Sequence, residues 1–157
     1  MPQINEIELK KQINSGNFAH LYFLYGDEKY LIRHYSSLIQ KKSIDPAFAD
    51  FNFHQYDGKE IDFDAVSQAS EALPMMSERT LILIKDLPAD SLNSDSSEKF
   101  LKLISDIPDT TVILISNPSI DVNMKSAKGK KMLSEIDKAG CSVLFEHIGL
   151  NQLVKLI

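Results

Sequence analysis

The turn at residues 26–29 is where this sequence would most readily support phosphate chemistry. It follows an apolar run that ends at Tyr25 and consists of Gly26, Asp27, Glu28 and Lys29, and ligands of open α/β sheets bind beyond such strand ends. A phosphate-binding P-loop has the pattern G-x-x-x-x-G-K-[ST], whose amides surround the phosphates and whose hydroxyl holds magnesium. This turn has one glycine, puts two carboxylates where phosphates would lie, and has tyrosine after its lysine. We therefore predict a tight strand-to-helix turn, a degenerate P-loop without NTP hydrolysis.

Two further strand ends carry polar residues without a catalytic pattern. A magnesium-binding strand end places an aspartate directly after the apolar run, whereas Lys85 stands there and Asp86 comes one residue later. Asn117 precedes Pro118, which is typical of a turn. A phospho-receiver domain would need an aspartate ending the third strand and a lysine ending the fifth, and Lys85 and His147 do not fit. We therefore predict no catalytic residue.

The histidines and the cysteine do not form a ligand set for a metal. They lie on different expected elements and lack metal-ligand spacing: His20, His34, His54, His147 and Cys141. A single cysteine allows no disulfide within the chain and suits a reducing cytoplasm. We expect no metal, no cofactor and a cytoplasmic location.

The composition fits one globular domain with an ordinary core. The chain has 157 residues, of which 43% are hydrophobic and 25% charged, close to the average for globular proteins. Its net charge of −5 disfavours a domain that coats DNA, because phosphate neutralisation dominates such binding. The apolar runs fall short of the roughly 18 residues that span a membrane. A basic segment is expected to be solvated surface rather than a nucleic-acid site: Lys125, Lys128, Lys130 and Lys131.

The chain alternates between strand and helix patterns. Continuous apolar runs indicate strands buried on both faces, at residues 20–25, 80–84 and 111–115, with a last strand at 141–145. Residues 51–56 alternate and predict a strand nearer an edge. Since buried parallel strands need helical crossovers, we predict a three-layer α/β/α domain with a mostly parallel five-stranded sheet.

Helices are expected between these strands, with caps that the sequence suggests. The expected helices cover residues 5–15, a segment after Asp27, 62–73, 95–107 and 129–138. Asp27 and Asp62 are predicted N-caps, and Asp95 with Glu98 is a predicted capping box. Leu73 is expected on the apolar face of the third helix.

The segment Leu73-Pro74-Met75-Met76 lies in the connection before the third strand and ends near Arg79. Side chains in such connections usually face water, and two exposed methionines favour a partner that buries them. Methionine is flexible and polarisable, which suits insertion into a hydrophobic cleft. The residues alone also allow the commoner arrangement, in which both methionines fold back onto the core.

The order of these motifs resembles the start of the delta subunit of bacterial DNA polymerase III, a clamp-loader family. The resemblance rests on residues 25–31, on the segment 72–79 and on the strand at 81–86, in that order and spacing. It covers nearly the whole chain, but only about the first half of a full-length delta subunit. It implies the RecA-like core of clamp-loader AAA+ proteins with the P-loop lost.

The resemblance also implies a function and partners. Two adjacent hydrophobic residues in the family insert into a cleft on the ring-shaped beta sliding clamp and open the ring, and they match Met75 and Met76, where family members often have leucine and an aromatic residue. Leu73 and Pro74 would position them, and Arg79 would lie at the polar rim. The subunit hydrolyses no ATP itself. Expected partners are the clamp, the gamma/tau and delta-prime subunits, and DNA only within the assembled loader, with no membrane.

Other interpretations stay open from the sequence. They are an active P-loop-like nucleotide hydrolase, a receiver-type signalling domain, and the delta-prime subunit, which is weakened by the lack of a cysteine-rich zinc module. An apolar pattern restarts at Gly149 and stops at Ile157. We therefore expect an AAA+-like clamp-binding domain at residues 1–148, the start of a helical lid domain at 149–157, and a continuation into a further domain.

Overall fold

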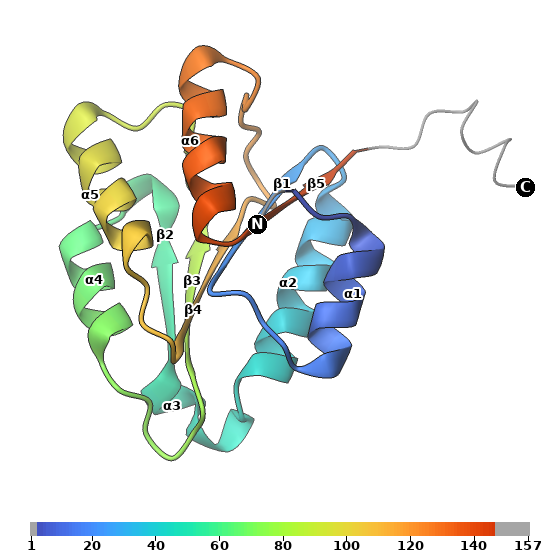
Figure 1. Cartoon of the computed structure of the whole chain (residues 1–157), viewed down its shortest axis with the longest axis vertical. Coiled ribbons are helices and arrows are strands. Elements are labelled where there is room, and N and C mark those ends of the chain that lie inside the picture. The colour runs from blue at the N-terminus through green and yellow to red at the C-terminus, as the bar shows by residue number, and fades with distance from the viewer. Residues whose placement is uncertain (1–2, 147–157) are drawn as a thin grey trace, which may run out of the picture.

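The computed structural model describes residues 3–146. In this range helices cover a five-stranded sheet (Figure 1). The strands are β1 (Leu21–Gly26), β2 (Phe53–Asp57), β3 (Thr80–Lys85), β4 (Thr111–Ser116) and β5 (Cys141–Phe145). The α-helices are α1 (Glu6–Ser15), α2 (Lys29–Ser43), α3 (Ala49–Asn52), α4 (Phe63–Glu71), α5 (Ser94–Ser105) and α6 (Ala127–Ala139). Two short 3-10 turns are η1 (Pro46–Phe48) and η2 (Gly58–Glu60).

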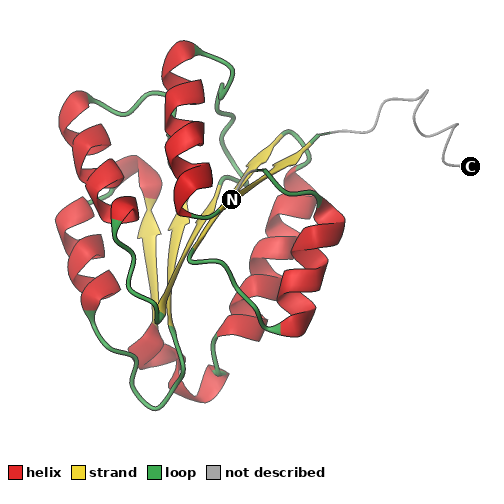
Figure 2. Ribbon diagram, viewed as in Figure 1, coloured by secondary structure: helices red, strands yellow, loops and turns green. Residues whose placement is uncertain are grey.

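The sheet has the strand order β2-β3-β4-β1-β5, and its four pairings are all parallel. The predicted three-layer α/β/α architecture with a parallel sheet is confirmed, as Figure 2 shows. The prediction that residues near 51–56 form an edge strand is also confirmed, because β2 pairs only with β3 in the described sheet.

Side chains of each strand alternate between two hydrophobic cores, as strand geometry requires. Leu21 and Phe23 face the core that α4, α5 and α6 cover, whereas Tyr22 and Leu24 face the core that α1 and α2 cover. Figure 1 shows these two groups of helices on opposite faces of the sheet. The continuous apolar runs of the sequence therefore reflect burial on both faces.

Two of the predicted helix caps are corrected by the structure. Asp62 caps α4 as expected, since its side chain accepts from the amide of Asp64 at 3.0 Å. Helix α2 instead has Glu28 at its N-cap position, without a side-chain cap bond. The reason is local: the Lys29 amide donates to the Asp27 carbonyl oxygen at 3.1 Å, so the turn closes before the helix begins.

The other corrected cap lies on α5. The side chain of Asn93 accepts from the Ser96 amide at 2.8 Å and caps the helix. The predicted capping box of Asp95 and Glu98 is therefore wrong, because Asp95 already lies inside the first turn. A capping box needs the acceptor at the residue before the helix, and this helix begins two residues earlier than the sequence pattern suggested.

The topology places the two predicted sites at opposite ends of the parallel strands. The turn at residues 26–29 follows β1 and lies at the carboxyl ends of the strands. The connection at residues 72–79 precedes β3 and lies at the amino ends, beside α3 in Figure 1. Residues 149–157, the expected start of a lid domain, lie outside the described residues.

Candidate functional site

The connection between α4 and β3, residues 72–79, presents large apolar side chains to solvent, and we call it the methionine loop. Helix α4 ends at Glu71, so the prediction that Leu73 lies on its apolar face is wrong. Leu73 is 81% exposed, Met75 55% and Met76 80%, while Pro74 is half-buried. The arrangement in which both methionines fold back onto the core is therefore not the one that the chain adopts.

Asn52, the last residue of α3, fixes the backbone of this loop. Its Nδ2 donates to the carbonyl oxygen of Met75 at 2.7 Å, and its Oδ1 accepts from the amide of Met75 at 2.7 Å. The Asn52 side chain is fully buried. Sequence reasoning missed this residue, because it placed residue 52 inside the strand expected at 51–56, whereas β2 begins only at Phe53.

Arg79 braces the other end of the methionine loop. Its guanidinium donates to the carbonyl oxygen of Ser43 at 3.2 Å and lies 4.8 Å from the centre of the Phe18 ring. It is also 3.8 Å from the carboxylate of Glu78. Arg79 ties the loop to the end of α2, and 22% of its side chain stays exposed.

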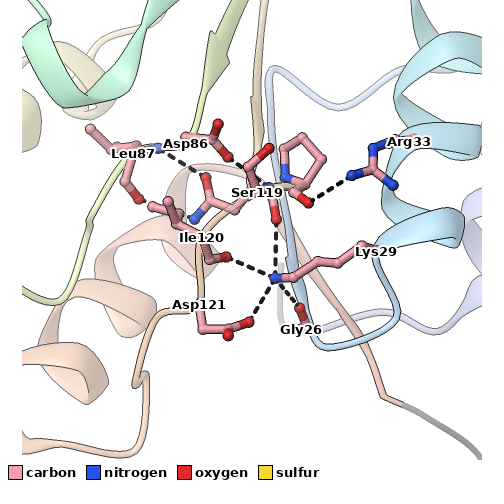
Figure 3. A network of polar contacts seen from close by, with 10 residues as sticks. Gly26, Lys29, Arg33, Asp86, Leu87, Ser119, Ile120 and Asp121 are labelled. Atoms are coloured by element: carbon pink, nitrogen blue, oxygen red, sulfur yellow. Dashed lines mark hydrogen bonds and ion pairs between the residues drawn. The ribbon is translucent and has the colours of Figure 1, made fainter.

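At the carboxyl ends of the strands, Lys29 closes the turn that follows β1 (Figure 3). Its Nζ donates to the carbonyl oxygens of Gly26 and Ile120, both at 2.7 Å, and lies 2.8 Å from a carboxylate oxygen of Asp121. The carbonyl oxygen of Asn117 is a more distant acceptor at 3.4 Å. The ammonium therefore joins the turn to the segment after β4, in the place where a P-loop lysine would face a phosphate.

The amides of this turn are also engaged within the protein. The Glu28 amide donates to the Phe145 carbonyl oxygen at 3.0 Å, and the Lys29 amide donates to Asp27. Gly26 has a φ of 127°, and a Cβ on it would lie 2.1 Å from the Phe145 oxygen. A phosphate cradle needs several free amides, whereas the amides of Glu28 and Lys29 already donate within the protein and the turn packs closely against β5.

The neighbouring strand ends form a second set of backbone ties. The Asn117 side chain is fully buried, and it accepts from the Leu87 amide and donates to the Leu87 carbonyl oxygen, both at 3.0 Å. Asp86 accepts from the amide of Ser119 at 3.0 Å (Figure 3). These residues hold the loops after β3 and β4 together, which fits the prediction that Asp86 and Asn117 are loop residues.

A pocket beside this turn has a lining of mixed charge. Asp27, Asp121 and Glu146 line it together with Lys125 and Lys130. Acidic and basic groups in nearly equal number create no positive field that would attract a phosphate.

Tyr25, which precedes the turn, has its pKa raised to about 12, mainly by burial and to a smaller extent by the charges of Asp137 and Glu146. A phenol of that pKa is neutral near neutral pH.

The described part of the chain, residues 3–146, gives no sign of a metal centre or a membrane span. No group of three or more His, Cys, Asp or Glu side chains in this range could hold a metal ion. No helix in the same range is long and apolar enough to cross a bilayer.

Comparisons with known proteins identify a family that matches most of the chain. The family model "DNA polymerase III, delta subunit" matches residues 22–144. The DNA polymerase III subunit delta of Bacillus subtilis (strain 168) is 33% identical over 76 residues, which are 48% of this chain and 22% of that protein.

Solved structures give the same fold. The Bacillus subtilis DNA clamp loader delta protein matches with a TM-score of 0.79 and 20% identity, over 96% of this chain and 45% of that one. A DNA polymerase III gamma subunit-related protein of Thermotoga maritima matches with a TM-score of 0.62, 16% identity, 91% of this chain and 47% of its own. A RuvB variant of Thermotoga maritima matches with a TM-score of 0.51, 16% identity, and coverages of 96% and 45%. The chain thus spans somewhat less than half the length of these solved chains.

Proposed function

The chain belongs to the DNA polymerase III delta-subunit family, and from this premise we propose that its methionine loop binds the beta sliding clamp and opens the ring for loading onto DNA. The observation that carries the proposal is the exposure of Met75 and Met76 on a loop whose backbone is tied down. Large apolar side chains on a short, fixed loop are costly in water unless a partner buries them. A hydrophobic cleft is the partner surface that fits them.

The two methionines would supply most of the binding energy. Buried apolar anchors of this kind dominate small interfaces, and the polar contacts around them contribute less. Leu73, exposed beside them, extends the apolar surface, and half-buried Pro74 stiffens the approach of the chain to Met75. Arg79 keeps part of its guanidinium at the edge of this surface, where it can serve the polar rim.

Opening of the ring would follow from a difference in affinity. A subunit that binds the open ring more tightly than the closed ring shifts the population of rings towards the open form. No bond is made or broken in this step, so the chain needs no catalytic residue. The closed turn at residues 26–29 supports a subunit that hydrolyses no ATP, since the Lys29 ammonium and the amides of Glu28 and Lys29 are engaged inside the protein.

The remaining assignments rest on the family. We propose residues 1–148 as the AAA+-like clamp-binding domain and residues 149–157 as the start of a helical lid domain. The gamma/tau and delta-prime subunits would be partners in the loader, in the cytoplasm, and DNA would be contacted only in the assembled complex. The acidic net charge of −5 supports the last point.

Clamp binding tests the proposal directly. The 157-residue chain and its Met75→Ser/Met76→Ser variant are compared for affinity to the beta clamp of the same organism by titration calorimetry. Burying a methionine side chain contributes about 1.5–3 kcal/mol and 1.4 kcal/mol is about tenfold in affinity, so the double variant should bind at least about 100-fold more weakly. Neither side chain supports the core, so its melting temperature should match that of the native chain.

A matched control separates the site from general loss of apolar surface. Ile7 and Tyr30 are 66% and 71% exposed. Tyr30 lies in the first turn of α2, at the carboxyl ends of the strands and away from the methionine loop. The Ile7→Ser/Tyr30→Ser variant should bind the clamp like the native chain. Equal binding by the methionine variant would remove the site assignment, and failure of the native chain to bind would remove the proposed function.

A further inference from the structure

Asn52 joins two segments at the base of the methionine loop that are 23 residues apart in sequence. Both polar groups of its buried amide bond to the backbone of Met75, as donor and as acceptor. An amide that makes this pair of bonds copies the pairing of one peptide group with another and fixes both the position and the direction of the bound backbone. The side chain of Met75 is left to point outward and is 55% exposed.

The residue after this tie has an unusual backbone conformation. Met76 has a φ of 55°, in a region that bulky L-residues rarely adopt. Such a conformation persists only where the surrounding structure holds it, and it is concentrated at functional segments. The ties lie on both sides of it: Asn52 bonds to Met75, and Arg79 bonds to the Ser43 carbonyl oxygen.

We propose that Asn52 is a positioning residue for clamp binding, which presets the methionine loop in its binding conformation before the clamp is met. This inference rests on the proposed function of the loop. A preset loop loses less conformational entropy on binding than a free one, so the same apolar contacts give a higher affinity. Asn52 itself is fully buried, so it would act through the loop rather than by touching the clamp.

A residue at the other end of the strands, after β4, provides a matched comparison. Asn117 is also fully buried, and its amide makes the same pair of bonds with the backbone of Leu87, both at 3.0 Å. Removing either amide deletes two hydrogen bonds from the interior and lowers stability in a similar way. If Asn52 only stabilised the fold, the two alanine variants would behave alike towards the clamp.

The experiment compares the native chain, Asn52→Ala and Asn117→Ala in two measurements. The first is affinity for the isolated beta clamp, and the second is amide hydrogen exchange of residues 72–79 in the free chain. Freeing one loop residue corresponds to about tenfold in affinity, so Asn52→Ala should bind about tenfold more weakly. Its loop amides should exchange faster, whereas Asn117→Ala should keep native affinity and native exchange in the loop.

A second variant guards against unfolding of the first. Asn52→Ser keeps a polar but uncharged side chain at this buried position, and it is too short to keep both bonds to the backbone of Met75. It should also weaken binding and speed exchange in the loop. Native affinity in both Asn52 variants, or an equal loss in Asn117→Ala, would overturn this inference and leave clamp binding intact. A native chain that does not bind the clamp would overturn the proposed function and this inference together.

Discussion

Replacing Lys29 with methionine is expected to destabilise the fold strongly, although Lys29 is the first residue of helix α2 and is partly exposed. The ammonium group has three N–H donors, and it has three short partners: the carbonyl oxygens of Gly26 and Ile120 at 2.7 Å and the carboxylate of Asp121 at 2.8 Å. Methionine keeps the length and the apolar stem of the side chain but offers no donor. The two carbonyl groups would then lose their charged partner.

The magnitude follows from these contacts. A hydrogen bond that involves a charged group contributes about 1.5–3 kcal/mol. The Lys29 side chain is 24% exposed, so water can partly replace it, and we take the lower value for each carbonyl, which gives about 3 kcal/mol. Asp121 is 82% exposed, so its ion pair adds less than about 1 kcal/mol.

Urea unfolding of the native chain and of Lys29→Met measures this difference. For a domain of this size 1 kcal/mol changes the melting temperature by about 2–4 °C, so thermal unfolding should shift down by about 6–12 °C. Lys102→Met is the matched control, because Lys102 is an exposed lysine on α5 and loses the same charge. That variant should stay within about 0.5 kcal/mol of the native chain.

Two results would refute this reasoning. If Lys29→Met were as stable as Lys102→Met, the ammonium would not hold the turn. A rise in the melting temperature of the native chain on adding magnesium and ATP would mean that the turn binds nucleotide, because a ligand of the folded state stabilises it. Lys29→Arg should be intermediate, since a planar guanidinium cannot meet convergent acceptors as an ammonium does.

Two further predictions concern the carboxyl end of β1. Gly26→Ala should lower the free energy of unfolding by at least about 2 kcal/mol, because the new Cβ meets the Phe145 oxygen and the positive φ is strained; Gly16→Ala, which has a positive φ but open space around it, should lose less in the same urea titration, and equal losses would contradict the steric argument. Burial raises the pKa of Tyr25 from 10.0 to about 12, so the folded chain retains a proton that the unfolded chain loses, and its contribution to stability should be full below pH 10 and be lost as the pH rises from 10 towards 12. A phenolate absorbance titration of the native chain against Tyr25→Phe checks this, and ionisation of Tyr25 near pH 10 would contradict it.

The sequence by itself predicted the layers of the fold. The runs at residues 80–84 and 111–115 are apolar at every position after an initial threonine, and they proved to be interior strands with both faces covered. The alternation at residues 51–56 predicted an edge strand, and β2, which runs from Phe53 to Asp57, lies at the edge. The spacing of apolar residues along a strand reflects which of its faces are buried, so a local pattern is enough for these predictions.

The candidate site was predicted in part. Met75 and Met76 were singled out because two large apolar residues in a polar connection are conspicuous, and the unsuitability of the turn at residues 26–29 followed from its carboxylates and its single glycine. The expected helix position of Leu73 was wrong, because an apolar residue at helical spacing looks the same whether the helix has ended or not.

Only the tertiary structure decided what holds these segments. Lys29 bonds to a carbonyl oxygen 91 residues away, and Asn52 bonds to the backbone of a residue 23 positions away. Every residue offers the same carbonyl and amide groups, so the partner of such a bond leaves no mark on its own side chain. Side-chain periodicity therefore determines which faces are buried, whereas the folded chain determines which backbone groups a buried amide or ammonium can reach.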